Sequence, residues 1–133
     1  MKKIFLLSAV VAALTITTSC SRTTVEVSYF NDGFPSWYSD SFLDMITVQN
    51  YITGLGIPYH DITNPLKYTG SGRNEAEARE KADKEAKKIA DEWVAKIKTA
   101  DIDALNLHEA TKFRWQVRSD IGTVIAEFSY KMD

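Results

Sequence analysis

The chain has 133 residues, of which 44% are hydrophobic and 26% are charged, and its formal net charge is −2 at pH 7. A chain of this length can bury a core of its own, and its single cysteine excludes an intrachain disulfide. The slight acidic excess argues against nucleic acid or anionic lipid as a main partner, since both bind through a basic face.

The first twenty residues have the pattern of an export signal. Lys2 and Lys3 precede an uncharged run from Ile4 to Ile16. As a helix this run would be about 20 Å long, which is short of the roughly 30 Å hydrocarbon core that a spanning helix must cross. Its length and its flanking residues therefore favour a signal peptide over a membrane anchor.

The residues after this run, Thr17-Thr18-Ser19-Cys20, resemble a bacterial lipobox, in which small residues precede a cysteine that is lipidated and becomes the new N-terminus. The resemblance is limited to residues 1–20. It implies a lipoprotein that carries acyl chains such as palmitate on Cys20. An ordinary secretory peptide with a cysteine near its cleavage site is the alternative, but a lipid cap explains better why an exported domain has one cysteine at this place.

The resemblance divides the chain into a signal peptide (1–19), a short tether (20–24) and a single α+β domain (25–133). Without Lys2 and Lys3, 14 basic and 18 acidic residues remain, so the mature net charge is −4. Ser21-Arg22 does not resemble an inner-membrane retention signal. We therefore expect a lipid-anchored protein of the outer membrane that faces the periplasm.

The first strand is predicted over Thr23 to Phe30, because apolar and polar residues alternate there. Asn31-Asp32-Gly33 predicts a turn. It is followed by an aromatic loop, Phe34 to Tyr38.

A helix is predicted over Ser39 to Thr53, with Ser41 and Asp44 as a capping pair. The alternative is a strand through Ile46-Thr47-Val48, because β-branched residues are disfavoured inside helices. The apolar stripe expected on the helix consists of Phe42, Met45, Ile46, Gln49 and Ile52.

Two short strands, Ile57 to Ile62 and Leu66 to Thr69, and one long helix are predicted next. Asn74 is the expected N-cap of the helix, Glu77 completes a capping box, and the helix continues to Lys98. Its buried stripe is Ala82, Ala86, Ile89, Ala90, Trp93, Val94 and Ile97. The opposite face offers five ion pairs, each with the acid four residues before the base: Glu75–Arg79, Glu77–Lys81, Glu80–Lys84, Asp83–Lys87 and Glu92–Lys96.

The C-terminus predicts a β-hairpin with a four-residue loop from Ser119 to Gly122, where Gly122 adopts the left-handed conformation. The expected cross-strand pairs are Val117 with Val124, Trp115 with Ala126, Phe113 with Phe128 and, on the outer face, Arg114 with Glu127.

Together these elements predict an α+β fold. We expect an antiparallel or mixed sheet of four to five strands, with one long and one shorter helix on one face. A ferredoxin-like, split βαβ arrangement is compatible with this order of elements, but it implies no function.

No motif predicts catalysis or a bound cofactor. His60-Asp61 and His108-Glu109 lie far apart and lack metal-ligand spacing, so we expect no metal site. No GxSxG motif is present, and no cysteine remains as a nucleophile once Cys20 is lipidated. We therefore expect a protein that is not an enzyme.

Two segments are candidate binding sites. Gly70-Ser71-Gly72-Arg73 precedes a helix and could form an anion nest, although a flexible turn is the simpler interpretation. The aromatic loop, with Phe34, Trp37 and Tyr38 beside Asp32, could contact an envelope protein or a glycan, or it could be part of the core. The sequence thus favours a structural or protein-interaction module, with a domain that binds a glycan or a small anion as the alternative.

Lipidation can be tested directly. Cys20→Ser should move the protein from the membrane fraction to the soluble fraction, because the acyl chains are lost. Fractionation and mass spectrometry of the mature N-terminus measure this change. A wild-type protein that is already soluble and lacks a lipid mass increment would contradict the assignment.

Overall fold

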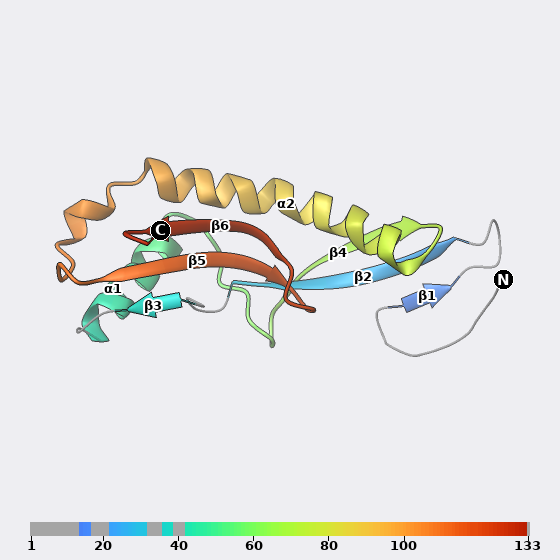
Figure 1. Ribbon diagram of the computed structural model, residues 1–133, viewed down its shortest axis with the longest axis horizontal. Helices are drawn as coiled ribbons and strands as arrows, with labels where there is room; N and C mark the ends of the chain where they lie inside the picture. The colour runs from blue at the N-terminus through green and yellow to red at the C-terminus, as the bar shows by residue number, and fades with distance from the viewer. Residues whose placement is uncertain (1–13, 17–21, 32–35, 39–41, 133) are drawn as a thin grey trace.

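The computed structural model describes residues 14–16, 22–31, 36–38 and 42–132, and it has an α+β fold, as predicted (Figure 1). A long helix lies along one face of a curled sheet in an elongated molecule. The elements in chain order are β1 (Leu14–Ile16), β2 (Thr23–Phe30), β3 (Ser36–Tyr38), α1 (Phe42–Gly54), β4 (Leu66–Gly72), α2 (Glu75–Thr99), a 3₁₀ turn (Ile102–Leu105), β5 (Lys112–Ser119) and β6 (Val124–Tyr130).

All strand pairings are antiparallel in the described chain, and the main strands follow the order β4-β2-β5-β6. β1 lies beside the first residues of β2, whereas β3 lies beside the first residues of β5. Since β4 and β5 run parallel on either side of β2, β4-α2-β5 is a split βαβ unit. A ferredoxin-like fold needs a second such unit. Here α1 joins β2 to its direct neighbour β4, so that unit is missing.

The inward face of the sheet follows the predicted alternation. Val25, Val27 and Tyr29 of β2 are buried, and so are Phe113, Trp115 and Val117 of β5. Tyr29 pairs with Ser119, which places both sets of side chains on the same face of the sheet. α2 covers this face, and α1 meets it at one end.

α2 begins as predicted, since the Asn74 side chain accepts a hydrogen bond of 2.8 Å from the Glu77 N–H. Glu77 does not close the capping box. Its carboxylate instead accepts from the backbone and guanidinium of Arg73, and these hydrogen bonds lower the pKa of Glu77. The buried stripe is as expected apart from half-buried Ile89, and it begins one turn earlier, at Ala78.

Glycines of β4 allow α2 to lie unusually close to the sheet. A Cβ atom on Gly70 would lie 1.9 Å from the carbonyl oxygen of Ala78 and 2.7 Å from the Ala82 nitrogen. A Cβ on Gly72 would lie 2.8 Å from the Glu77 Cγ. Small residues on both sides therefore bring the helix backbone almost into contact with the strand.

Most of the predicted ion pairs on α2 do not form, and Arg79 and Asp83 contact other elements instead. Only Glu77–Lys81 forms among the described residues, at 3.8 Å. Arg79 instead pairs with Asp120 in the β5–β6 loop, and Asp83 accepts a hydrogen bond of 2.6 Å from the Tyr29 hydroxyl. Helical spacing predicted neighbours on one helix, but the sheet lies close enough to provide better-placed partners.

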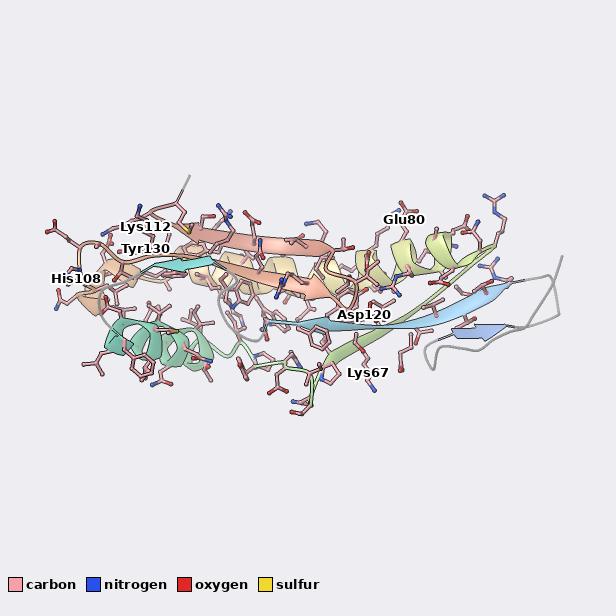
Figure 2. All side chains as sticks on the ribbon, turned by 60° about the horizontal axis from the view of Figure 1, so that its bottom comes forward. Lys67, Glu80, His108, Lys112, Asp120 and Tyr130 are labelled. Atoms are coloured by element: carbon pink, nitrogen blue, oxygen red, sulfur yellow. The ribbon has the colours of Figure 1, made fainter. Side chains whose placement is uncertain are left out.

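Tyr29, Asp83, Arg79 and Asp120 form a polar cluster in the middle of the molecule. Asp120, labelled in Figure 2, also accepts a hydrogen bond of 3.4 Å from the Ser28 N–H. Burial, followed by the hydrogen bond and charge of Asp83, raises the pKa of the Tyr29 hydroxyl far above its usual range. Tyr29 therefore stays protonated and connects β2 to α2, a structural rather than a chemical role.

The hairpin register differs from the prediction by two residues. Val117 pairs with Ala126, Trp115 with Phe128 and Phe113 with Tyr130, and a bulge at Ile125 separates the pairs Val117–Ala126 and Arg118–Val124. Gly122 is left-handed as predicted, with φ of 88°. Parity kept the faces of β5 correct, but parity cannot distinguish registers that differ by an even number. The bulge inserts one residue and pairs Val124 with Arg118 on the outer face, so Val124 is exposed rather than buried.

The predicted Arg114–Glu127 cross-strand pair is consequently diagonal. Gln116 lies opposite Glu127, and its side-chain amide donates to the Glu127 carboxylate at 3.0 Å. The Arg114 guanidinium still reaches Glu127 at 3.6 Å.

The first helix and the short strands also need correction. α1 confirms the helix and excludes the strand through residues 46–48. Residues 57–62 form a loop instead of a strand, because their backbone is held by the side chain and the N–H of Asn31 and not by a neighbouring strand. β4 extends past Thr69 to Gly72.

Gly70→Ala tests the close approach of α2. We expect a loss of about 3 kcal/mol in unfolding free energy, because the new methyl group collides with the helix backbone. Gly54→Ala is the matched control, since nothing lies within 4 Å of its Cβ position, and stability should stay level or rise by up to about 1 kcal/mol. Urea unfolding of both variants gives the comparison. Equal changes in unfolding free energy in the two variants would exclude the close contact between Gly70 and α2.

Candidate interaction surface

The two sides of α1 differ sharply in burial. Asp44, Val48 and Ile52 recur every four residues and face inward. Phe42 and Leu43 are each 70% exposed, and Ile46 is 41% exposed. The predicted stripe is therefore wrong in its first half, because Phe42 and Ile46 point to solvent and a carboxylate takes the inward position.

Asp44 explains this orientation of α1. Its carboxylate accepts a hydrogen bond of 2.8 Å from the His108 N–H and another from the Thr111 hydroxyl, both in the segment before β5. Figure 2 places His108 at the α1 end of the molecule. A buried carboxylate is costly unless it accepts such hydrogen bonds. Asp44 must therefore face this segment, which turns Phe42 and Leu43 outward.

The outward side of α1 carries no charged side chain. Asp44 is the only charged residue of the helix, and it is buried. The exposed residues of α1 between its ends are Phe42, Leu43, Ile46, Thr47, Asn50 and Thr53. In a chain with 26% charged residues this stretch is distinct.

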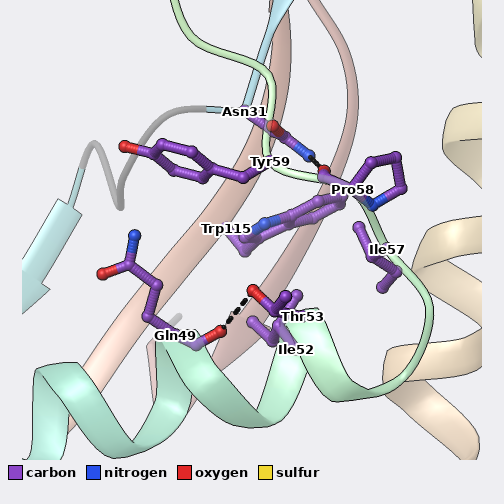
Figure 3. A pocket seen from close by; sticks show the side chains of 8 residues that line it. All are labelled: Asn31, Gln49, Ile52, Thr53, Ile57, Pro58, Tyr59 and Trp115. Atoms are coloured by element: carbon purple, nitrogen blue, oxygen red, sulfur yellow. Dashed lines mark hydrogen bonds between the residues drawn. The ribbon is translucent and has the colours of Figure 1, made fainter.

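A pocket continues this side of the helix (Figure 3). Phe42, Ile46, Gln49 and Thr53 follow one another at steps of four, three and four residues, so they form one stripe. Gln49 and Thr53 also line the pocket, together with Tyr59 at its side and Trp115 at its base. The empty space is about 260 Å³, part of it open to solvent. We define the neutral surface as the exposed residues of α1 together with this pocket, which includes Gln49 and Tyr59.

The loop that carries Tyr59 is held firmly by Asn31. The Asn31 amide donates to the Pro58 carbonyl at 2.9 Å, and its side-chain oxygen accepts from the His60 N–H at 2.6 Å. The Asn31 N–H donates to the His60 carbonyl at 2.9 Å. The His60 ring stacks on Trp93 of α2 at 5.9 Å between centroids. Tyr59, 44% exposed, therefore sits on an ordered backbone.

The residues that line the pocket are apolar, aromatic or amide- and hydroxyl-bearing, and none of them carries a carboxylate, imidazole, ammonium or guanidinium group. Apolar side chains beside amides and hydroxyls suit a partner that offers an apolar group and a few hydrogen bonds.

One part of the predicted aromatic segment, β3, lies near this pocket. Trp37 and Tyr38 form β3, where Trp37 pairs with Phe113 and Tyr38 with Lys112. Phe113 is two residues from Trp115 on β5, so β3 runs beside the strand that forms the pocket base. The side chains of Trp37 and Tyr38, and the residues Phe34, Asp32 and Cys20, lie outside the described part of the structure.

The proposed anion nest does not form. Gly70, Ser71 and Gly72 are the last residues of β4, and their extended backbone replaces the expected loop. The Arg73 guanidinium forms an ion pair with the Glu77 carboxylate at 3.2 Å. The glycines allow the close approach of α2.

Histidine and acidic side chains form no group of three or more that could hold a metal ion in the described ranges. The His60 Nδ1 lies 2.9 Å from the Asn64 carbonyl oxygen, and the His108 Nδ1 accepts from the Ala110 N–H at 3.3 Å. Both rings contact their own loops.

Asp44, Gln49 and Tyr59 were not predicted as residues of a functional site: Asp44 was expected to cap α1, and Gln49 was expected in its apolar stripe. For Asp44 a signal existed, because a lone charge in an otherwise uncharged helix must either be exposed or have a specific partner. For Gln49 and Tyr59 there was no signal, since they meet only through the fold.

In comparisons with known proteins, no family model, curated protein or solved structure matches this chain. Its function therefore has to be inferred from the residues themselves.

Replacing Asp44 tests the orientation of α1. Asp44→Ala should lower the unfolding free energy by about 2–3 kcal/mol, because two buried donors lose a charged acceptor. Asp91→Ala, which removes an exposed carboxylate paired with Lys87, should cost about 0.5 kcal/mol or less. Hydrogen exchange of the His108 amide should accelerate in the first variant alone. Unchanged protection would show that Asp44 does not hold this segment.

Proposed function

We propose that this chain is a non-catalytic lipoprotein of the cell envelope that binds another protein through the neutral surface. The observation that carries the proposal is the outward side of α1, where three large apolar side chains are exposed with no charge among them.

Exposed apolar groups at this density favour a partner. Contact between apolar surfaces removes them from water at about 25 cal/mol per Å², and the centres of protein interfaces are depleted of charged residues. Phe42, Leu43 and Ile46 fit this pattern. We infer a partner with an uncharged, largely apolar patch that packs over these side chains and over the shallow pocket beside Tyr59.

The small size of the pocket argues against a free ligand. Pockets for small molecules typically measure roughly 300–1,000 Å³, whereas the space that this shallow pocket offers to another atom is about 10 Å³. The absence of a positive charge among its lining residues also argues against a small anion.

The surface lies at the far end of the molecule from the proposed lipid. In Figure 1, β1 and the start of β2 lie at one end, and α1 lies at the other. Cys20 lies three residues before Thr23, the first residue of β2, so a lipid on Cys20 would lie at the opposite end of the molecule from the neutral surface. No helix in the described ranges is long and apolar enough to cross a bilayer. We propose the outer membrane, with the domain in the periplasm.

A glycan is the second candidate for the same pocket. The observation in its favour is the exposed Tyr59 ring beside the Gln49 amide, since rings stack on sugars and amides bind hydroxyl groups. A glycan ligand would depend on Tyr59 and Gln49, whereas a protein partner would depend mainly on Phe42 and Ile46.

A photo-crosslinking amino acid at Leu43 tests the protein partner in intact cells. We expect an adduct of defined mass that disappears in the Phe42→Gln, Ile46→Gln variant, because the apolar contact is lost. The adduct should persist in Ile121→Gln, which changes a 70% exposed side chain in the β5–β6 loop. All variants should keep their unfolding free energy within about 1 kcal/mol.

The partner identified from the adduct should also bind the purified domain. If the adduct is lost to the same extent in the Ile121→Gln control, non-specific apolar contact and not the neutral surface causes the adduct. Loss of glycan-array binding in Tyr59→Ala, with the protein adduct absent throughout, would favour the second candidate.

A further inference from the structure

β1 occupies an edge of the sheet that the mature lipoprotein would leave open. Leu14, Thr15 and Ile16 pair with Val25, Thr24 and Thr23 of β2. These three residues lie before Cys20, inside the segment that processing removes. The inference below therefore rests on the lipid-anchored form proposed above.

The opposite edge of β2 is filled by β4 from Thr23 to Tyr29, so only the β1 side opens. On that side β5 pairs with Tyr29 and Phe30 alone. The Ser28 N–H points to this side, because it donates to Asp120. Since backbone groups alternate along a strand, the N–H and C=O groups of Thr24 and Glu26 point the same way. Removal of β1 exposes those of Thr24, and together with the groups of Glu26 they form a template for another strand.

Among the described residues of the mature chain, no strand is left to cover this edge. Cys20 is three residues from Thr23, which is too short for a turn and a returning strand, and the lipid would hold it at the membrane. β6 pairs with the far side of β5 and ends near α1. A strand that covers the open edge would therefore come from a second chain.

We propose that this strand is β2 of a second copy, paired antiparallel about a two-fold axis at Thr24. In this register Thr24 of the second copy takes the position of Thr15, and Val25 of the second copy takes the position of Ile16. Thr23 of the second copy replaces Leu14. A threonine at the centre and a β-branched apolar residue beside it are thus retained from the pairing that β1 makes.

Charge pairing favours a two-fold axis at Thr24 over an axis at Glu26. Arg22, Thr24 and Glu26 share the outer face of β2, so an axis at Thr24 puts Arg22 of each copy opposite Glu26 of the other. An axis at Glu26 would set two carboxylates directly opposite each other. Copies anchored in one membrane also meet at high effective concentration, which strengthens a contact made mainly by backbone hydrogen bonds.

Disulfide trapping in membranes tests the register. Lipidated Cys20 is blocked, so Thr24→Cys introduces one reactive thiol. The two Thr24 Cα atoms should lie about 5.5 Å apart, within disulfide range. Oxidation should therefore give a disulfide-linked dimer that a reductant converts back to the monomer. Ser28→Cys is the matched control on the same face of β2, where the two thiols would be about 27 Å apart and should remain unlinked.

Charge reversal provides a second measurement. Glu26→Arg in the Thr24→Cys background should reduce the dimer yield about threefold or more, since like charges then face each other twice. Adding Arg22→Glu should restore the yield, which a merely structural defect would not do.

Mass spectrometry of the N-terminus separates the possible failures. A lipidated N-terminus at Cys20 without a Thr24 dimer overturns the pairing but leaves the lipoprotein proposal standing. Retention of residues 14–16 overturns both. A Thr24 adduct with a different protein shows that the edge is used but overturns the second copy as its occupant.

Discussion

The close approach of α2 to β4 is the constraint on which the rest of the structure depends. Alanines on the helix face glycines on the strand, so the backbones nearly touch and no large side chain separates them. This distance brings Asp83 within reach of the Tyr29 hydroxyl and Arg79 within reach of Asp120. Large residues enter only at the C-terminal half of α2, where Trp93, Val94 and Ile97 fill the widening space above the sheet.

Buried polar groups then determine the local structure around the neutral surface. Asn31 holds the loop of Tyr59, and Asp44 holds α1 against the segment before β5. In the described chain, every buried side-chain nitrogen or oxygen has a hydrogen-bond partner. Such groups specify one arrangement, because any other leaves a buried charge or amide unsatisfied. The exposure of Phe42 and Leu43 is a consequence of this requirement.

The proposed functions separate along the length of the molecule. One end of the molecule carries β1 and the start of β2, and the other end carries α1 with the neutral surface. A pairing of two copies at the tether would leave both neutral surfaces unobstructed, so anchoring and partner binding need not compete. The net negative charge lies elsewhere, since neither of these two contact regions is rich in acidic residues.

The sequence by itself determined the elements whose signals are local. β2 and α2 appear where alternation, the Asn74 cap and the alanine stripe predicted them, and β5 buries the expected face. Only the tertiary structure decided which side of α1 is buried, the hairpin register and the partners of Arg79 and Asp83. Each of these depends on residues distant in the chain: Asp44 needs His108, and Arg79 needs Asp120. The neutral surface was unpredictable for the same reason, because periodicity shows that a helix has two sides but cannot show that its carboxylate is the buried one.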